Sequence, residues 1–475
     1  MASDLSYVGV MGRNAQIMKK AVGINYDDFR LGPFAFDYEK MMREVGYSIE
    51  EVQRIQLETG VGQTPILELR NITALARKLA PKGKGARIFI KDEAANPSGS
   101  FKDRRASLSV HIAKQKGYPG VICASSGNYA AAVASQAAMR GLKCIIVQEV
   151  FDSRGVGQPE IIEKSRKCEA YGAEVQQLSV GPELFYVLLR LLEETGFFSA
   201  SLYTPFAIAG IETLGFELGT QFKKNQGIAP TAVVIAHAGG GNVTGTARGL
   251  LKAGCSDTKI IAASVDLTGL HMASDYDFNR KSFTTAHTGF AMPFTTWPDR
   301  ADVPLNAARS LRYMDRFVSI KQGSVFYITE MLAQLEGLER GPAGNTSLAA
   351  AFAIAQEMDE DDILVVQETE YTGAGKHPWA QLNFAADNGV DIKYGNPAEE
   401  VAGKNIIIPE HPRYIQVTEA PIEKLRRSYL TNTIAKLPGK TVTEVDLDYL
   451  VDETRGSREL IKNILGESDI IVGSK

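Results

Sequence analysis

The chain has 475 residues, of which 44% are hydrophobic and 23% charged, and its net charge is −4. This balance is typical of an ordinary globular protein and lacks the basic excess that binding to nucleic acid or anionic lipid requires. No apolar run is long enough to span a bilayer, and residues 1–20 have no continuous apolar core ahead of a cleavage site. We therefore expect a cytoplasmic protein without nucleic-acid or membrane partners.

The cysteines and histidines do not form a metal-binding pattern. The chain has six scattered histidines and four cysteines without a Cys-x-x-Cys pair. Structural zinc sites and disulfide frameworks need closely spaced ligands or a regular set of cysteines. We therefore expect no metal site, and we expect most of the cysteines to be buried packing thiols. The cysteines are Cys123, Cys144, Cys168 and Cys255.

The order of apolar runs predicts an α/β fold. A chain of this length exceeds the size at which one hydrophobic core stops growing, so two packed domains are expected. Short apolar runs alternate with helical patterns, which indicates buried parallel strands flanked by helices. Strands are predicted over 87–90, 120–123, 144–147, 231–236, 260–265 and 363–366, and Ala-rich helices over 129–140 and 347–357.

Ligands of open α/β sheets bind beyond the carboxyl ends of the strands, so the loops that follow these runs are the candidate site. The first of three informative loops spans 96–105 and reads NPSGSFKDRR, with Lys102 in the first turn of a predicted helix. Partial burial, the positive helix end and the neighbours Arg104 and Arg105 would favour the reactive neutral amine. Taken alone, the pattern also fits a solvated lysine at a helix start.

The second loop contains Ser125, Ser126, Gly127 and Asn128, directly between a predicted strand and an Ala-rich helix. Free backbone N–H groups at a helix start bind anions such as a substrate carboxylate. The Asn128 amide and the serine hydroxyls add hydrogen-bonding groups. A plain helix N-cap is the structural alternative.

The third loop reads GGGNVTG and follows the predicted strand 231–236. Glycines let backbone amides close around a phosphate, although they also serve tight turns. Thr244 and Thr246 stand where a dinucleotide fingerprint needs its last glycine and a Walker A loop its lysine. A small phosphorylated cofactor is therefore favoured. The expected phosphate ligands are Gly239, Gly240, Gly241, Asn242, Val243 and Thr244.

The three loops, in this order, resemble the fold type II family of pyridoxal-phosphate enzymes, over roughly residues 64–376. This family includes threonine synthase, threonine dehydratase and the tryptophan synthase β subunit. The resemblance implies two open, twisted, mostly parallel sheets flanked by helices, and pyridoxal 5′-phosphate as cofactor. It also implies an N-terminal extension over 1–60 packed on a large domain (61–110 and 211–475), and a smaller mobile domain over 111–210.

The resemblance also assigns the site residues. Lys102 would hold the cofactor as a Schiff base and shuttle protons, and Asn128 would contact the ring hydroxyl. Ser125, Ser126 and Gly127 would bind the substrate carboxylate. Thr369, with Thr372 as a neighbouring alternative, would face the ring nitrogen. Where several members carry Glu-Pro, this chain has Gly341-Pro342, so the role of that glutamate is missing or supplied elsewhere.

The long N-terminal extension, the stretch 371–379 (YTGAGKHPW) and the C-terminal tail resemble the family of 2-amino-4-ketopentanoate thiolase β subunits. This resemblance implies ornithine degradation: cleavage of the substrate with coenzyme A to acetyl-CoA and alanine, by a β homodimer within a hetero-oligomer with a small α subunit. The alternatives are threonine synthase, although Tyr129 is atypical there, a β-eliminating lyase, and a non-catalytic subunit. The stretch 271–299, with Tyr276, Arg280, His287 and Trp297, is a candidate substrate or partner surface, or only a long loop.

Overall fold

The computed structural model describes residues 4–151, 155–179, 183–267, 283–284, 301–302, 309–371, 378–435, 437 and 439–473. The stretch 271–299, apart from residues 283–284, and Thr372 lie outside the described residues. Among the described residues, none of the helices combines the length and the apolar character that a bilayer crossing requires.

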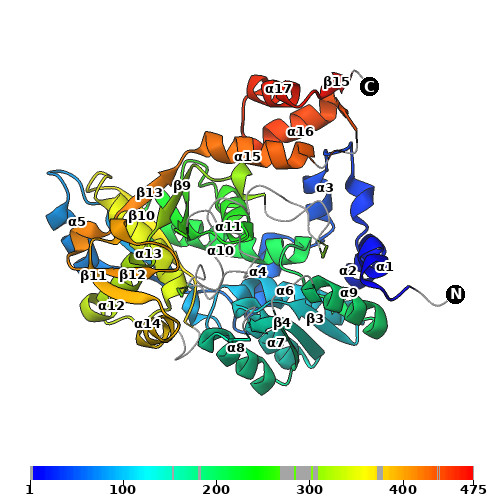
Figure 1. Cartoon of the computed structure of the whole chain (residues 1–475), viewed down its shortest axis with the longest axis horizontal. Helices are drawn as coiled ribbons and strands as arrows, with labels where there is room; N and C mark the ends of the chain where they lie inside the picture. Colours follow the sequence, from blue (N-terminus) through cyan, green and yellow to red (C-terminus); the bar gives the residue numbers. More distant parts are fainter. Residues whose placement is uncertain are drawn as a thin grey trace.

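A seven-stranded sheet forms the centre of the larger part of the molecule (Figure 1). Its strand order is β1-β2-β10-β7-β8-β9-β13; the first and last strands are antiparallel to their neighbours and the inner pairs are parallel. The strands are β1 (Ile66–Glu68), β2 (Arg87–Asp92), β7 (Ala232–Ala236), β8 (Lys259–Val265), β9 (Arg316–Ile320), β10 (Ile363–Glu368) and β13 (Val417–Ala420).

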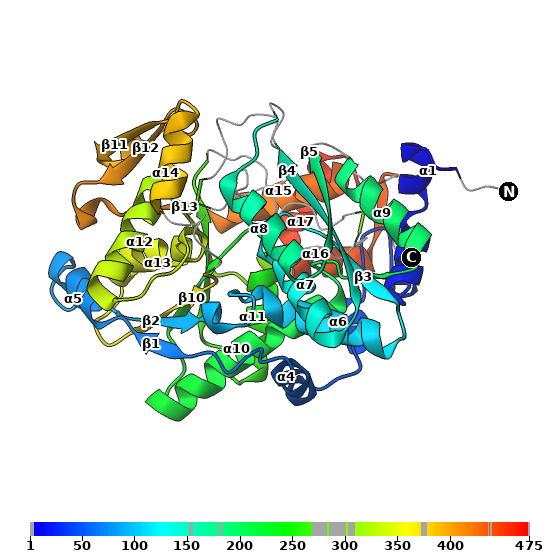
Figure 2. The same ribbon diagram turned by 90° about the horizontal axis from the view of Figure 1, so that it is seen from below.

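Strand β10 shows why the central strands have continuous apolar sequences. Ile363 and Val365 belong to one hydrophobic cluster, and Leu364 and Val366 belong to another, because successive side chains point to opposite faces. Both faces are covered by helices, α10 and α11 on one side and α5, α12 and α13 on the other (Figure 2). Such a strand must be apolar throughout.

A second sheet has four parallel strands in the order β5-β4-β3-β6. Its strands are β3 (Gly120–Ala124), β4 (Lys143–Phe151), β5 (Glu174–Ser179) and β6 (Phe198–Ser199). All six predicted strands are therefore present, in two mostly parallel sheets, and the expected fold class is confirmed. Two further pairs of short parallel strands are β11 (Asp391–Gly395) with β12 (Asn405–Pro409), and β14 (Thr441–Thr443) with β15 (Ile471–Gly473).

The helices begin and end at residues suited to those positions. Helix α7 ends at Gly141, which adopts a left-handed conformation with φ 68°. Helix α13 begins at Pro342, five residues before the predicted start, because proline is well suited to the first helical turn. The longer helices of the body are α5 (Arg70–Leu79), α6 (Lys102–Gln115), α7 (Asn128–Arg140), α8 (Pro159–Ala170), α9 (Glu183–Thr195), α10 (Pro205–Gln226), α11 (Gly241–Lys252), α12 (Gln322–Glu336), α13 (Pro342–Ala355) and α14 (Pro378–Asp387).

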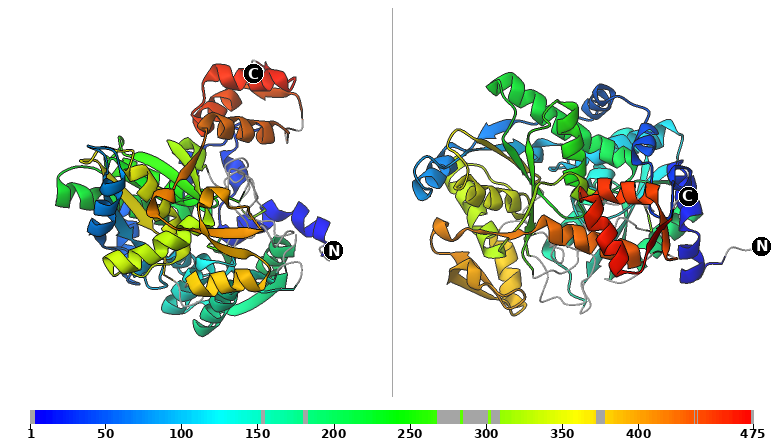
Figure 3. Two further views of the ribbon diagram at one scale, coloured as in Figure 1. Left: turned by 60° about the vertical axis from the view of Figure 1, so that its left-hand side comes forward. Right: turned by 90° about the horizontal axis from the view of Figure 1, so that it is seen from above.

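The two ends of the chain contact each other and the body. The C-terminal helices stand above the rest of the molecule (Figure 3), and Asp446 there accepts hydrogen bonds from the backbone N–H groups of Phe34 and Ala35. The N-terminal helices share a hydrophobic cluster with the four-stranded sheet, and α4 also contacts α10. The helices are α1 (Tyr7–Gly12), α2 (Asn14–Val22), α3 (Tyr38–Arg43), α4 (Ile49–Leu57), α15 (Ile422–Ala435), α16 (Glu444–Thr454) and α17 (Arg458–Glu467).

Helices α10 and α11 touch backbone to backbone. A Cβ atom on Gly215 would lie 1.9 Å from the carbonyl oxygen of Thr246, and one on Gly249 would lie 1.9 Å from that of Glu212. Backbone atoms cannot move aside as a side chain can. The glycines therefore set the distance between α10 and α11, and with it the position of the loop that precedes α11.

We expect Gly249→Ala to lower the free energy of unfolding by about 1–3 kcal/mol, because the added methyl group forces α11 away from α10. The measurement is chemical denaturation. Gly466→Ala in α17 is the matched control: it meets nothing within 4 Å, and alanine is the better helix former by about 0.5–1 kcal/mol. Equal stability of G249A and wild type would contradict this account.

Candidate active site

Three neighbouring strands of the large sheet place the candidate loops at one edge. β2, β10 and β7 are adjacent and parallel, so their carboxyl ends lie together. The loop with Lys102 follows β2, Thr369 follows β10, and the glycine-rich loop follows β7. Asn128, from the four-stranded sheet, reaches this edge because its Nδ2 donates to Oε2 of Glu370 at 3.1 Å. The structure thus brings together residues from all three predicted loops.

Lys102 is the first residue of α6 and is held by a rigid loop. The N–H group of Phe101 donates to the carbonyl of Thr369 at 3.0 Å, and that of Tyr371 donates to the carbonyl of Gly99 at 2.8 Å. Gly99 has φ 80°, a left-handed conformation that favours glycine. These bonds join the lysine loop to the end of β10, which fixes Lys102 relative to Thr369.

The side chain of Lys102 lies in an environment that favours the neutral amine. Nζ is 4.7 Å from the centre of the Phe101 ring. Burial, and secondarily the positive charge of Arg105, hold the pKa of Lys102 well below its usual value. A neutral amine is a nucleophile and can accept a proton, as a covalent anchor for an aldehyde cofactor requires.

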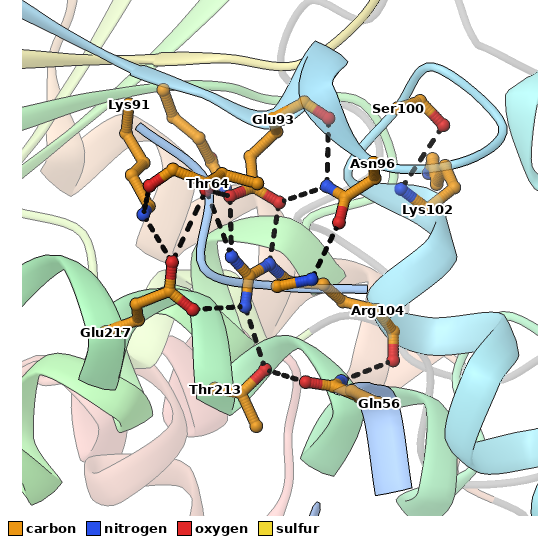
Figure 4. A network of polar contacts seen from close by, with 12 residues as sticks. Gln56, Thr64, Lys91, Glu93, Asn96, Ser100, Lys102, Arg104, Thr213 and Glu217 are labelled. Carbon is orange, nitrogen blue, oxygen red and sulfur yellow. Dashed lines mark hydrogen bonds and ion pairs between the residues drawn. The ribbon is translucent and has the colours of Figure 1, made fainter. Parts of the chain in front are cut away.

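Arg104 does not act on Lys102 as the sequence suggested, because its charge is balanced by carboxylates. Its Nε lies 2.6 Å from Glu93 and its Nη1 lies 3.1 Å from Glu217, and all three side chains are buried. Lys91 lies 2.6 Å from the other oxygen of Glu217. Figure 4 shows this network next to Lys102. Of Arg104 and Arg105, Arg105 is the one that adds to the effect of burial in lowering the pKa of Lys102.

Neutral groups complete the network around Arg104. Gln56 donates to the carbonyl of Arg104 at 2.9 Å, and Thr64 donates to Glu93 at 2.6 Å. Thr213 donates to the amide oxygen of Gln56 at 2.7 Å. The start of α6 is thereby joined to α4, to η2 (Glu93–Ala95) and to α10, so the backbone that carries Lys102 has little freedom (Figure 4).

Ser125, Ser126 and Gly127 form the turn between β3 and α7. The hydroxyl of Ser126 accepts from the N–H group of Glu149 at 2.9 Å, which ties the turn to β4. The N–H group of Gly127 donates to the Ser125 hydroxyl at 3.3 Å. Asn128 is the first residue of α7, as the N-terminal anion site requires. Binding of a substrate carboxylate by this turn stays a prediction.

The glycine-rich loop passes directly into α11. Gly240 has φ 82°, and the helix begins at Gly241, so Asn242, Val243 and Thr244 lie in its first turn rather than in the expected loop. A Cβ atom on Gly241 would lie 2.7 Å from Nη2 of Arg105. Residues 239–244, the proposed phosphate cup, therefore include the start of a helix. Backbone N–H groups at a helix start suit a phosphate.

Asn242 gives a second indication that the cup fits an anion. Its Oδ1 accepts from Gln367 Nε2 at 3.0 Å, but its Nδ2 is buried without a hydrogen-bond partner among the described residues. Buried donors are normally paired, so an unpaired one indicates a missing acceptor. Gln367 was not identified from the sequence, although a polar residue within the apolar strand β10 is a usable signal.

Glu370 occupies the space that glycine leaves at position 341. A Cβ atom on Gly341 would lie 2.2 Å from Oε1 of Glu370, and the Gly341 N–H group donates to the Glu370 carbonyl at 3.0 Å. A carboxyl group thus lies beside the start of α13 although position 341 lacks one. Thr369 was predicted from the sequence, but the carboxylates on either side of it, Glu368 and Glu370, were not.

Glu368 is fully buried next to Thr369, which is 5% exposed. Burial, together with the charges of Glu370 and Asp92, raises the pKa of Glu368 well above its usual range. Its side chain lies where a Cβ atom on Gly344 would stand. The glycines of the Gly-Pro-Ala-Gly sequence therefore make room for two carboxyl groups from the end of β10.

The four cysteines are free and buried. Burial raises the pKa of Cys123 well above its usual range, so a thiolate at this position is unfavourable. In the parts of the chain that the structure describes, no group of three or more His, Cys, Asp or Glu side chains is arranged to hold a metal ion.

Comparisons with known proteins identify a family and similar relatives. The family model of pyridoxal-phosphate dependent enzymes matches residues 57–368. The 2-amino-4-ketopentanoate thiolase beta subunit of Acetoanaerobium sticklandii is 67% identical over 467 residues, 98% of this chain and 99% of the relative. The threonine synthase of Bacillus sp. (strain ULM1) is 32% identical over 185 residues, 38% of this chain and 47% of the relative.

Solved structures share the fold. A mutant of O-ureido-L-serine synthase with bound O-ureido-L-serine has a TM-score of 0.51 and 22% identity, and covers 67% of this chain and 90% of that chain. The chain belongs to the family of pyridoxal-phosphate dependent enzymes. Within this family, the chain groups with the 2-amino-4-ketopentanoate thiolase beta subunits, and the similarity to them spans nearly the full length of the chain.

The buried charges predict how stability depends on pH. Burial alone would raise the pKa of Glu217, but Arg104 and Lys91 bring it down to about 2. A carboxyl group with a lowered pKa stabilises the fold above its unfolded pKa, and this contribution is lost as the pH falls. We expect the free energy of unfolding to drop by about 3 kcal/mol between pH 4.5 and pH 2 through this group.

Denaturation curves at a series of pH values measure this drop. Glu217→Gln should lower the stability at pH 7 and flatten the dependence below pH 4.5, because the titrating group is gone. Glu58→Gln is the control, since Glu58 lies on the surface with a 56% exposed side chain. An unchanged pH dependence in E217Q would contradict the assignment.

Proposed function

We propose that the chain is the catalytic β subunit of a 2-amino-4-ketopentanoate thiolase, which cleaves its substrate with coenzyme A to acetyl-CoA and alanine. The observation that carries the proposal is 67% identity over 98% of the chain with a relative of that name, combined with a lysine site that fits the cofactor. The similarity to threonine synthase covers only 38% of the chain, so that function is the weaker alternative.

Each predicted site residue has a place in this proposal. Pyridoxal phosphate, when bound, supplies an electron sink that stabilises negative charge near the substrate's amino group. Lys102 would hold it through Nζ, and Asn128 would contact its ring hydroxyl. Thr369 would face its ring nitrogen, and residues 125–127 would bind the substrate carboxylate. The phosphate ligands would be Gly239, Gly240, Gly241, Asn242, Val243 and Thr244.

Lys102 also has the properties of the proton carrier. Attack of the coenzyme A sulfur on C4 forms a C–S bond, and cleavage of the C3–C4 bond leaves an electron pair on C3. A proton delivered from Nζ to C3 then forms the methyl group of alanine, and the proton that the coenzyme A thiol gives up restores the one lost from Nζ. The low pKa of Lys102, caused by burial and Arg105, makes Nζ release a proton more readily than the amine of an exposed lysine.

The name β subunit, carried by the relatives, supports a partner. We propose a small α subunit bound to a homodimer of this chain. We also propose that 111–210 moves as a smaller domain relative to 61–110 and 211–475. The hydrogen bond from Asn128 to Glu370 runs between these two parts, so such a movement would open and close the site.

The role of Lys102 is tested by absorbance. Wild-type protein should show the visible absorbance of covalently bound pyridoxal phosphate and retain the cofactor after reduction with borohydride. Lys102→Ala should lose both, because the amine that would anchor the cofactor is gone. Lys167→Ala is the control, since Lys167 binds the carbonyl of Ser98 nearby without belonging to the proposed site. Undiminished, reducible cofactor on K102A would contradict the proposal.

The reaction is tested by mixing the purified chain and its small partner with 2-amino-4-ketopentanoate and coenzyme A. We expect acetyl-CoA and alanine in equal amounts, and neither product from K102A. Phosphate release from O-phosphohomoserine without acetyl-CoA would move the assignment to threonine synthase. Ammonia and a keto acid formed from serine, threonine or diaminopropionate, with no need for coenzyme A, would move it to a β-eliminating lyase.

A further inference from the structure

Arg105 joins the lysine helix to the phosphate cup. Its side chain is 2% exposed, and its Nη1 donates to the carbonyl of Leu202 at 2.6 Å. Its Nη2 lies 2.7 Å from the position that a Cβ atom on Gly241 would take. The guanidinium is therefore held by the segment before α10 and placed against the first residue of α11.

The guanidinium and the helix start have charges of the same sign. The first turn of α11 carries the partial positive charge of a helix N-terminus, and arginine stays protonated at all relevant pH values. An anion that contacts both groups is attracted by both, and the low dielectric of a buried site strengthens that attraction.

Two features of the first turn of α11 favour such an anion. Gly240 and Gly241 have no side chains to fill the cup, and Asn242 in the same turn has a buried Nδ2 that lacks a hydrogen-bond partner within the described chain. Asn242 itself is 6% exposed. A guanidinium, an amide donor and free helix N–H groups form the donor set that a phosphate ester accepts.

We propose that Arg105 is a direct ligand of the cofactor's phosphate and supplies a full positive charge to a cup otherwise made of backbone N–H groups. This inference rests on the proposed function, because it requires pyridoxal phosphate at Lys102. Arg105 follows Lys102 by three positions, so both side chains lie on one face of α6. One turn of helix thus carries the covalent anchor and the phosphate ligand.

The test compares the full-length protein with Arg105→Met, which keeps the length but not the charge, and Arg105→Lys, which keeps the charge. Affinities for pyridoxal phosphate and for pyridoxal, which lacks the phosphate, are measured by titrating the cofactor-free protein. R105M should bind pyridoxal phosphate about 10-fold to 100-fold more weakly, the effect of a charge-assisted hydrogen bond. Its affinity for pyridoxal should fall much less, because only the changed pKa of Lys102 acts there and no phosphate contact is lost, and R105K should be intermediate.

Arg140→Met is the matched control. Arg140 is also a buried arginine, bound to Glu58 at 3.0 Å and to the carbonyl of Ile55 at 2.9 Å, but it lies at the far end of α7. R140M should leave the preference for pyridoxal phosphate over pyridoxal unchanged. The KM for coenzyme A should not change in R105M. A rise in this KM without a loss of cofactor affinity would assign Arg105 to the coenzyme A phosphates instead and would overturn the proposal.

A second measurement needs no variant. The phosphorus NMR signal of the bound cofactor in wild-type protein should stay at the dianion position well below pH 6, where a free phosphate ester takes up a proton. A free-ester titration in the wild type, or an unchanged phosphate preference in R105M, would overturn the role of Arg105 alone. Absence of covalent cofactor at Lys102 in the wild type would overturn the proposed function and this inference together.

Discussion

The position of the site depends on one buried ion network, the contact of Arg104 with Glu93 and Glu217. A buried charge is costly unless it is paired and hydrogen-bonded. Here the guanidinium bonds two carboxylates, and Lys91 balances the second one. Removing any member would leave a charge without its partner. The network therefore allows essentially one arrangement of β2, α6 and α10, and Lys102 lies two residues from its centre.

The neighbouring arginines of this helix contact different parts of the molecule. Arg104 contacts carboxylates and stabilises the fold, whereas Arg105 lies against the start of α11. Arg105 is also the second cause, behind burial, of the low pKa of Lys102. This difference arises from the helical period, since successive residues point about 100° apart. A short sequence can therefore contain a structural charge and a functional one side by side. The roles of Arg104 and Arg105 differ because each contacts different residues of the neighbouring elements.

Most of the architecture could be predicted from local sequence. The run 363–366 is apolar at every position because its strand is covered on both faces, and the same reason applies to the other parallel strands. The loops with Lys102, Asn128 and Gly239 were identified because glycine, proline and helix-start residues mark the ends of such strands. Helix starts were less exact: α13 and α11 both begin earlier than their apolar patterns indicate.

The sequence by itself determined the α/β class, the candidate lysine and the order of the three loops, because these depend on residues adjacent in the chain. Only the tertiary structure decided that Glu370 lies in the space left by Gly341, that Gln367 bonds Asn242, and that Arg105 meets Gly241. Each of these contacts joins residues far apart in the chain. Such pairs have no local pattern, since their distance is set by how two sheets and their helices pack.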